Sequence, residues 1–188
     1  GASRLVEFGN GPDSDTIALN CDIVNRDIER EVCVGGARKA IGARVLVPGK
    51  WTHFAATIDA AGFARIFRDG VQIQSGALAL PTRVARKSCY LGKSTRAGAA
   101  AFVGKISDVR LWTAPRTVAE INAGMTRRLV GDEAGLAAYW RLDDEDGAVA
   151  RDARLAAVRC DGALKGSATW RRGKPELSDW CVGLASAA

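Results

Sequence analysis

The stretch Trp51–Gly70, WTHFAATIDAAGFARIFRDG, decides the fold of this chain. Apolar residues alternate with polar or small ones from Phe54 to Ile58, and this period of two is typical of an antiparallel strand. The stretch ends in an Asp-Gly pair that begins at Asp69, which suits a tight hairpin because both central residues of that turn need positive φ. The stretch therefore predicts an antiparallel sheet with one face toward water, and we expect function on that face or in the loops.

Short strand patterns extend on both sides of this hairpin. They are predicted at 4–8, 16–24, 29–35, 43–47, 51–59, 63–68, 71–74, 88–92 and 102–112. Many short strands at close spacing, without helical patterns between them, are typical of a sandwich or jelly roll. We therefore predict an all-β fold, a two-sheet antiparallel jelly-roll sandwich.

One short helix is predicted near residues 117–128. Thr117 and Glu120 have the spacing of a capping box, in which side chains and backbone N–H groups at the helix start satisfy each other. Arg127 and Arg128 are expected in the last turn, where a positive charge complements the helix dipole. Apolar residues at helical spacing predict a face that packs on the sandwich: Val118, Ile121, Met125 and Leu129.

The length of 188 residues suits a single domain of this class. We predict one domain over 1–188, with core blocks in 1–130 and a closing strand and tail in 131–188, unless the latter begin a further unit. No apolar run reaches the roughly 18 residues that a membrane helix needs, so no membrane span is expected. The formal net charge of +6 suggests acidic partners, and scattered charge that only keeps the protein in solution is the alternative. Without a dense basic run and an aromatic ladder, we expect no nucleic-acid partner.

The five cysteines lack the CxxC spacing of zinc and redox sites. Cys21 and Cys33 lie equidistant from Asp27, so a hairpin that turns there predicts a disulfide between them. A bridge between Cys160 and Cys181 is a second option, and small buried thiols are the alternative to both. The odd count leaves at least one thiol without a partner inside the chain.

Four ordered blocks resemble the laminin-G-like domains of the concanavalin A-like lectin/glucanase superfamily: WTHFAATID, ARIFRDG, YLGK and FVGKISDVRLW, the last followed by the capped helix. The later segment GLAAYWRLDDEDG, with its downstream ATW, is also similar to a family segment. Two departures stand out. That segment often opens a family domain but comes late here, and an early strand with the pattern E-A-W is missing. Either the chain is a fragment, or its terminal segment fills the vacant place.

Many members of this family hold a calcium ion near a sheet rim, so the resemblance implies a candidate calcium site in this chain. The matching residues are Asp108 and Asp152, and carboxylate oxygens are the ligands that calcium prefers. Where many members have turn residues whose carbonyls complete the shell, this chain has a segment that contains Arg154, which adds a positive charge. The alternative is that Asp108 is an ordinary carboxylate at a strand end.

A candidate ligand site follows from the tail. An exposed Trp170 beside Arg171 and Arg172 could stack on a sugar ring while the guanidinium groups hold an acidic substituent. The alternative is that Trp170 packs the tail against the domain.

Catalysis is not predicted. The acids of Asp143–Asp146 are consecutive and end in glycine, which is typical of a turn, whereas a retaining glycosidase strand needs acids at i and i+4 on one side. His53 is the single histidine and has no nucleophile motif beside it.

We expect a non-catalytic recognition module that binds carbohydrate or glycoprotein, including acidic glycans, at its loops or concave sheet. A structural or protein-interaction module of a larger multidomain surface protein or adhesin is the alternative, and a glycoside hydrolase is the third reading. An extracellular or cell-surface location is expected.

Overall fold

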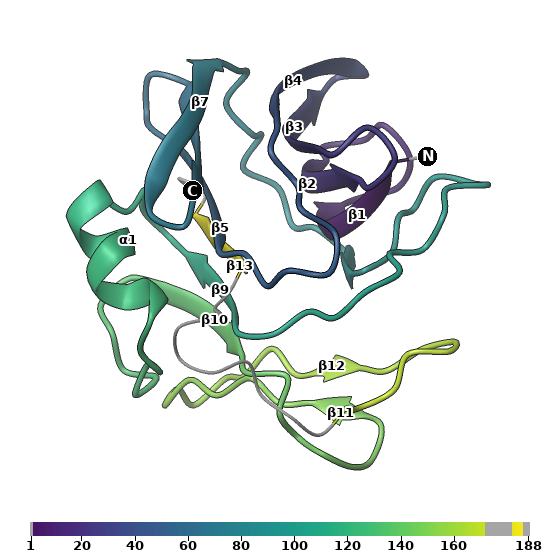
Figure 1. Cartoon of the computed structure of the whole chain (residues 1–188), viewed down its shortest axis with the longest axis vertical. Helices are drawn as coiled ribbons and strands as arrows, with labels where there is room; N and C mark the ends of the chain where they lie inside the picture. The colour runs from purple at the N-terminus through teal and green to yellow at the C-terminus, as the bar shows by residue number, and fades with distance from the viewer. Residues whose placement is uncertain (1, 172–181, 186–188) are drawn as a thin grey trace.

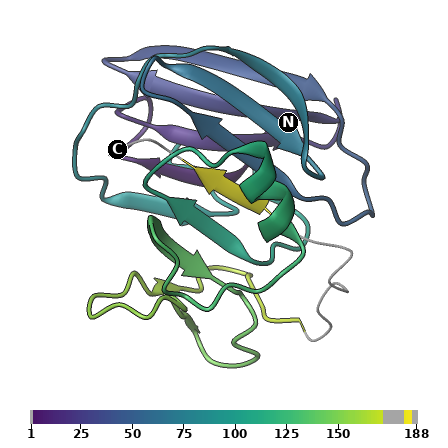
Figure 2. The same ribbon diagram turned by 90° about the vertical axis from the view of Figure 1, so that its left-hand side faces the viewer.

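The computed structural model describes residues 2–171 and the backbone of 182–185, and its strands form two stacked sheets (Figures 1 and 2). The first sheet has five strands in the order β4-β3-β2-β1-β8, all antiparallel. Its strands are β1 (Ser3–Gly9), β2 (Ile17–Asp22), β3 (Asp27–Val34), β4 (Ala37–Arg44) and β8 (Ser88–Leu91). The predicted all-β sandwich class is confirmed.

The second sheet has six strands in the order β10-β9-β13-β5-β6-β7. They are β5 (Phe54–Ile58), β6 (Phe63–Arg68), β7 (Val71–Ala77), β9 (Val109–Trp112), β10 (Leu136–Trp140) and β13 (Val182–Ala185). β13 lies between β5 and β9 and runs parallel to both. The terminal strand thus takes a central place in this sheet. A small pair, β11 (Val149–Ala150) and β12 (Gly162–Ala163), lies below the sandwich in Figure 1.

The hydrophobic core lies between the two sheets. Apolar side chains of the five-stranded sheet meet those of the six-stranded sheet in one cluster: Leu5, Val6, Leu19, Cys21, Ile28, Phe54, Ala56, Ile66 and Val109. A second cluster contains Val32, Ile58, Ala64 and Leu78. These are the inward positions of alternating strands, as the period of two predicts. Within the part of the chain that the structure describes, no helix is long and apolar enough to cross a membrane.

The predicted Asp-Gly hairpin is confirmed. Asp69 and Gly70 have φ of 49° and 77°, and Arg68 pairs with Val71 across the turn. A Cβ on Gly70 would lie 1.8 Å from Oδ1 of Asn122, so this turn needs glycine for space as well as for φ.

Two predicted strands differ by six or more residues at one end from the strands of the structure. The strand expected at 43–47 is β4 at Ala37–Arg44, because Gly35 and Gly36 adopt φ of 55° and 80° and turn the chain back early. The strand expected at 102–112 shortens to Val109–Trp112, because Asp108 has φ of 55° and interrupts the extended backbone.

Helix α1 (Val118–Met125) covers the outer face of the six-stranded sheet, as Figure 2 shows. Its capping box is confirmed, with Thr117 and Glu120 bonding each other's backbone N–H groups. The prediction that Arg127 and Arg128 lie in the last turn of the helix was wrong. Thr126 leaves the helical conformation, so both arginines lie beyond the helix.

The helix also changes the environment of β5. Ile121 packs against Ala55 and Phe67, and His53 and Thr57 on the same face are buried. The prediction that this face of β5 is exposed to solvent was therefore wrong where α1 covers the strand. The alternation of the sequence identifies the two faces but does not say which elements cover them.

Candidate functional site

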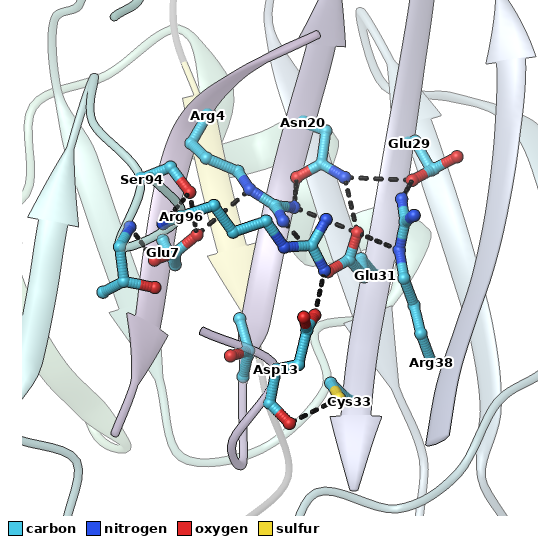
Figure 3. A network of polar contacts seen from close by, with 12 residues as sticks. Arg4, Glu7, Asp13, Asn20, Glu29, Glu31, Cys33, Arg38, Ser94 and Arg96 are labelled. Atoms are coloured by element: carbon cyan, nitrogen blue, oxygen red, sulfur yellow. Dashed lines mark hydrogen bonds and ion pairs between the residues drawn. The ribbon is translucent and has the colours of Figure 1, made fainter. Parts of the chain in front are cut away.

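A network of charged and polar side chains covers the outer face of the five-stranded sheet (Figure 3). Arg4 of β1 lies at its centre and is 5% exposed. Its guanidinium pairs with Glu31 of β3 (Nη2–Oε1, 3.0 Å) and with Glu7 (Nε–Oε2, 3.0 Å), and it donates a hydrogen bond to Asn20 of β2. Because both carboxylates are buried and bonded, the centre of this network is held in one geometry.

A β-bulge places both Arg4 and Glu7 on this face. Residues three apart on a regular strand point to opposite faces. The register shifts between Arg4, which pairs with Asn20, and Val6, which pairs with Leu19. The extra residue turns Glu7 to the same side as Arg4, where Ser94 Oγ and Thr95 N donate to its carboxylate at 2.9 and 2.7 Å.

Half-exposed charged groups surround this buried centre. Arg38 Nε lies 2.6 Å from Glu31 Oε2, and Arg38 Nη2 lies 3.1 Å from Glu29 Oε1. Arg96 pairs with Asp13 and also reaches Glu31. The exposed side-chain fractions are 47% for Arg38, 35% for Glu29, 29% for Arg96 and 55% for Asp13. We call these four residues the polar rim.

Tyr90 of β8 lies on the same face of the five-stranded sheet, next to Glu7 of β1. It pairs directly with Glu7 across β8 and β1, so the two side chains share one side of the sheet. The Lys93 ammonium lies 5.2 Å from the centroid of its ring. The face thus combines fixed hydrogen-bond donors, fixed acceptors and one half-buried aromatic ring.

The network includes an acid pattern that the sequence reasoning missed. Asp27, Glu29 and Glu31 are spaced at i, i+2 and i+4 on β3, so they share one face. This is the spacing that a retaining glycosidase strand needs and that the Asp143–Asp146 turn lacks. The strand-like alternation of DIEREV was the signal that could have revealed it.

The environment of Glu31 does not suit acid catalysis. Burial alone would raise its pKa, but the hydrogen bonds and charges of Arg4, with Asn20 and Arg38, lower the pKa below its usual value. A general acid needs a raised pKa so that it still carries its proton near neutral pH. Glu31 is therefore an ionised anchor for three arginines.

The Asp143–Asp146 turn is also structural. Asp143 pairs with Arg128 at 2.7 Å, and Asp144 pairs with Arg151 at 3.1 Å. No strand brings these acids to one face.

The two predicted calcium ligands are bonded to cations and N–H groups. Asp108 is buried and pairs with Arg110, and the Tyr139 hydroxyl donates to it at 3.0 Å. Asp152 is fully buried; it accepts from the backbone N–H of Tyr139 and Cys160 and pairs with Arg154 at 2.8 Å.

A calcium shell needs about six to eight oxygen ligands, and these partners are donors. Among residues 2–171 no group of three or more carboxylate, histidine or cysteine side chains could hold a metal ion. The residues as they lie do not fit calcium, and its binding stays an untested prediction.

Of the three predicted sugar-binding residues, the structure describes Trp170 and Arg171. Trp170 is half-buried, and its indole N–H donates to the carbonyl of Gly147 at 2.9 Å. Arg171 is exposed, and Arg172 lies outside the described residues. This anchoring favours the packing alternative for Trp170, and its role in ligand binding stays a prediction.

The predicted Cys21–Cys33 disulfide is wrong, since both thiols are free. The hairpin turns between Asp22 and Asp27, so Cys21 pairs with Ile28, while Cys33 lies at the far end of β3 beside Thr16. The prediction centred the hairpin turn on Asp27, which is later in the chain than the turn that the structure shows. The alternative bridge of Cys160 cannot be assessed, because Cys181 lies outside the described residues.

A small pocket of about 60 Å³ lies beneath α1. His53, Arg110 and Trp112 are among the residues that line it. His53 is 6% exposed, and burial, with the charge of Arg110, lowers its pKa to about 4. The pocket has room for a few water molecules but is far smaller than the roughly 300 Å³ of a usual ligand site. The face that carries the polar rim is therefore the better candidate site.

A family model described as the Concanavalin A-like lectin/glucanases superfamily matches residues 15–122, more than half of the chain. Among solved structures, a "putative carbohydrate binding protein" from Bacteroides ovatus is similar, with a TM-score of 0.58 and 19% identity. The match covers 88% of this chain and 54% of that one, so this chain spans about half of its length.

A second structure, an S-layer domain-containing protein from Clostridium thermocellum (residues 221–444), is more distant. It has a TM-score of 0.35 and 20% identity, and the match covers 64% of this chain and 61% of that one. No curated protein matches. The likeness to the Bacteroides ovatus structure supports the shared sandwich fold.

Proposed function

Because the chain belongs to the Concanavalin A-like lectin/glucanases superfamily, we propose that it is a non-catalytic carbohydrate-binding module, which binds sugar at the polar rim of the five-stranded sheet. The observation that carries this proposal is the fixed network under the rim. Arg38 and Arg96 are each held by the buried Glu31, so they offer N–H groups to solvent in set positions. Sugar hydroxyls both donate and accept hydrogen bonds, and fixed partners reduce the entropy lost on binding.

The charges of this face favour a hydroxyl-rich neutral sugar. Arg4, Arg38 and Arg96 are balanced by four acids of the same network: Glu7, Asp13, Glu29 and Glu31. The net charge of +6 thus comes from other surfaces. Binding at the polar rim should therefore depend little on salt. An acidic glycan held by Arg171 and Arg172 would instead bind more weakly as salt rises.

The name of the Bacteroides ovatus neighbour and the superfamily both support a carbohydrate ligand. Such a module works outside the cell or on its surface, where glycans are found, within a larger multidomain protein. The lowered pKa of Glu31 argues against a role for this residue as a general acid.

The test is a glycan array at low and high salt, followed by calorimetric titration of the strongest binder. Arg38→Ala removes a rim donor while Arg4 and Arg96 still pair with Glu31, so the fold should persist and affinity should fall at least tenfold. Arg65→Ala is the matched control: Arg65 is 35% exposed and pairs with Asp59 on the other sheet. Equal affinities of both variants and the unsubstituted protein would refute the rim site. A silent array with capture of a protein partner would favour the interaction-module alternative.

A further inference from the structure

Arg30 is an arginine inside the sandwich core. It lies on β3 between Ile28 and Val32 and is 1% exposed. Its neighbours across the sheet are Leu19 on β2 and Ile41 on β4. Ile28 belongs to one core cluster and Val32 to the other, so Arg30 lies on β3 between residues of both clusters.

The acids beside Arg30 in the sequence do not neutralise it. Glu29 and Glu31 point to the opposite face of β3, where they pair with Arg4 and Arg38. Nε and Nη1 of Arg30 are buried and have no hydrogen-bond acceptor among the described residues. The charged group with which Arg30 interacts is another arginine, Arg86, and this interaction is repulsive.

Arg86 reaches this region from the connection between β7 and β8. Its Nε donates to the carbonyl of Asp15 at 2.8 Å, and its Nη2 donates to the carbonyl of Thr82 at 2.9 Å. The half-buried Arg86 is thus fixed by carbonyl groups, which carry no full charge. Asp15 interacts electrostatically with Arg86, and no carboxylate among the described residues does so with Arg30.

A lone buried charge is costly. Burial lowers the pKa of Arg30 to about 10, so the guanidinium stays protonated at neutral pH. An unpaired ion in a protein interior is strongly unfavourable, and buried charges are normally paired. Repulsion between the buried Arg30 and the half-buried Arg86 is relieved when an anion lies between their guanidinium groups.

We propose that Arg30, together with Arg86, binds one small inorganic anion of the halide class inside the sandwich. The residues Leu19, Ile28, Val32 and Ile41, which flank Arg30 on the same face of the sheet, are apolar, so a small monovalent anion suits this position better than a large polar organic anion. The anion supplies the counter-charge that lets β3 carry an arginine at an inward position. This site is separate from the polar rim, on the opposite face of the same strand.

Urea unfolding at constant ionic strength tests the proposal. Chloride is varied from 1 to 200 mM against gluconate, which is too large to enter the core. The urea midpoint of the unsubstituted protein should rise with chloride, because a ligand that binds only the folded state stabilises it. Arg30→Met keeps an unbranched but shorter side chain and removes its charge, and its midpoint should not respond to chloride. Arg65→Met is the control and should keep the full response.

A crystal of the unsubstituted protein soaked in sodium bromide gives the direct readout, which does not depend on the folding of Arg30→Met. An anomalous peak within hydrogen-bonding distance of Arg30 Nε or Nη1 is the expected result. The proposal would be overturned if that position held water or a carboxylate of the chain and no bromide. It would also be overturned if Arg30→Met responded to chloride as the unsubstituted protein does.

Discussion

Acidification should weaken this fold measurably before most carboxylates titrate, because of His53. The imidazole is buried beneath α1, and its pKa falls to about 4 through burial and the charge of Arg110, against an opposing effect of Asp69. In the unfolded chain the pKa of histidine is about 6.5. Protonation therefore favours the unfolded state. Stability is complete above pH 6.5, declines as the pH falls below that value, and levels off below pH 4 with respect to this group.

The size of the loss follows from the two pKa values. Between pH 7.5 and pH 5, a single group that shifts from 6.5 to about 4 contributes about 2 kcal/mol of lost stability. His53 is the only histidine, so no other side chain with an ordinary pKa titrates near pH 6.5.

The assay is urea unfolding of the unsubstituted protein and of His53→Gln, measured at steps of about half a pH unit between pH 5 and pH 7.5. Carboxylates contribute equally to both proteins, so the difference between their two pH curves isolates the imidazole. We expect the curves to diverge by about 2 kcal/mol toward pH 5. Parallel curves would refute the reasoning, since they would mean that His53 is as accessible to protons in the fold as in the unfolded chain.

Three further predictions test the network, the turn and the metal. Arg4→Met should destabilise the protein by about 3–5 kcal/mol in urea unfolding, because it leaves two buried glutamates without their main partner. The surface control Arg65→Met should cost no more than about 1 kcal/mol. Equal losses of stability in the two variants would contradict a cooperative network. Gly70→Ala should cost at least about 1 kcal/mol, and Gly70→Ala with Asn122→Ala should recover the steric part but not the part due to φ. Melting temperatures should be the same in calcium and in EDTA, and a rise of several degrees in calcium would instead restore the metal site that the family resemblance implies.

The sequence predicts most of the fold because its signals are local. Alternation from Phe54 to Ile58, the Asp69-Gly70 turn and the capping box of Thr117 each depend on residues close in the chain, and all three are confirmed. The place of β13 between β5 and β9 depends on pairing across more than seventy residues, which no local pattern encodes.

The candidate site was harder to predict for the same reason. A bulge between Arg4 and Val6 brings Arg4 and Glu7 to one face, and the register of β2 and β3 then adds Asn20 and Glu31. A bulge leaves no clear mark in the sequence. The Cys21–Cys33 prediction failed because it assumed the position of a turn that the register places elsewhere.

The most direct measurement for the sugar-binding face is an NMR titration of the protein with the oligosaccharide that binds most strongly on a glycan array. The amide and side-chain signals of Glu29, Arg38 and Arg96 should shift with the added sugar, while those of the helix on the opposite sheet stay in place. Shifts confined to that helix or to Trp170, with these three residues unchanged, would contradict the assignment.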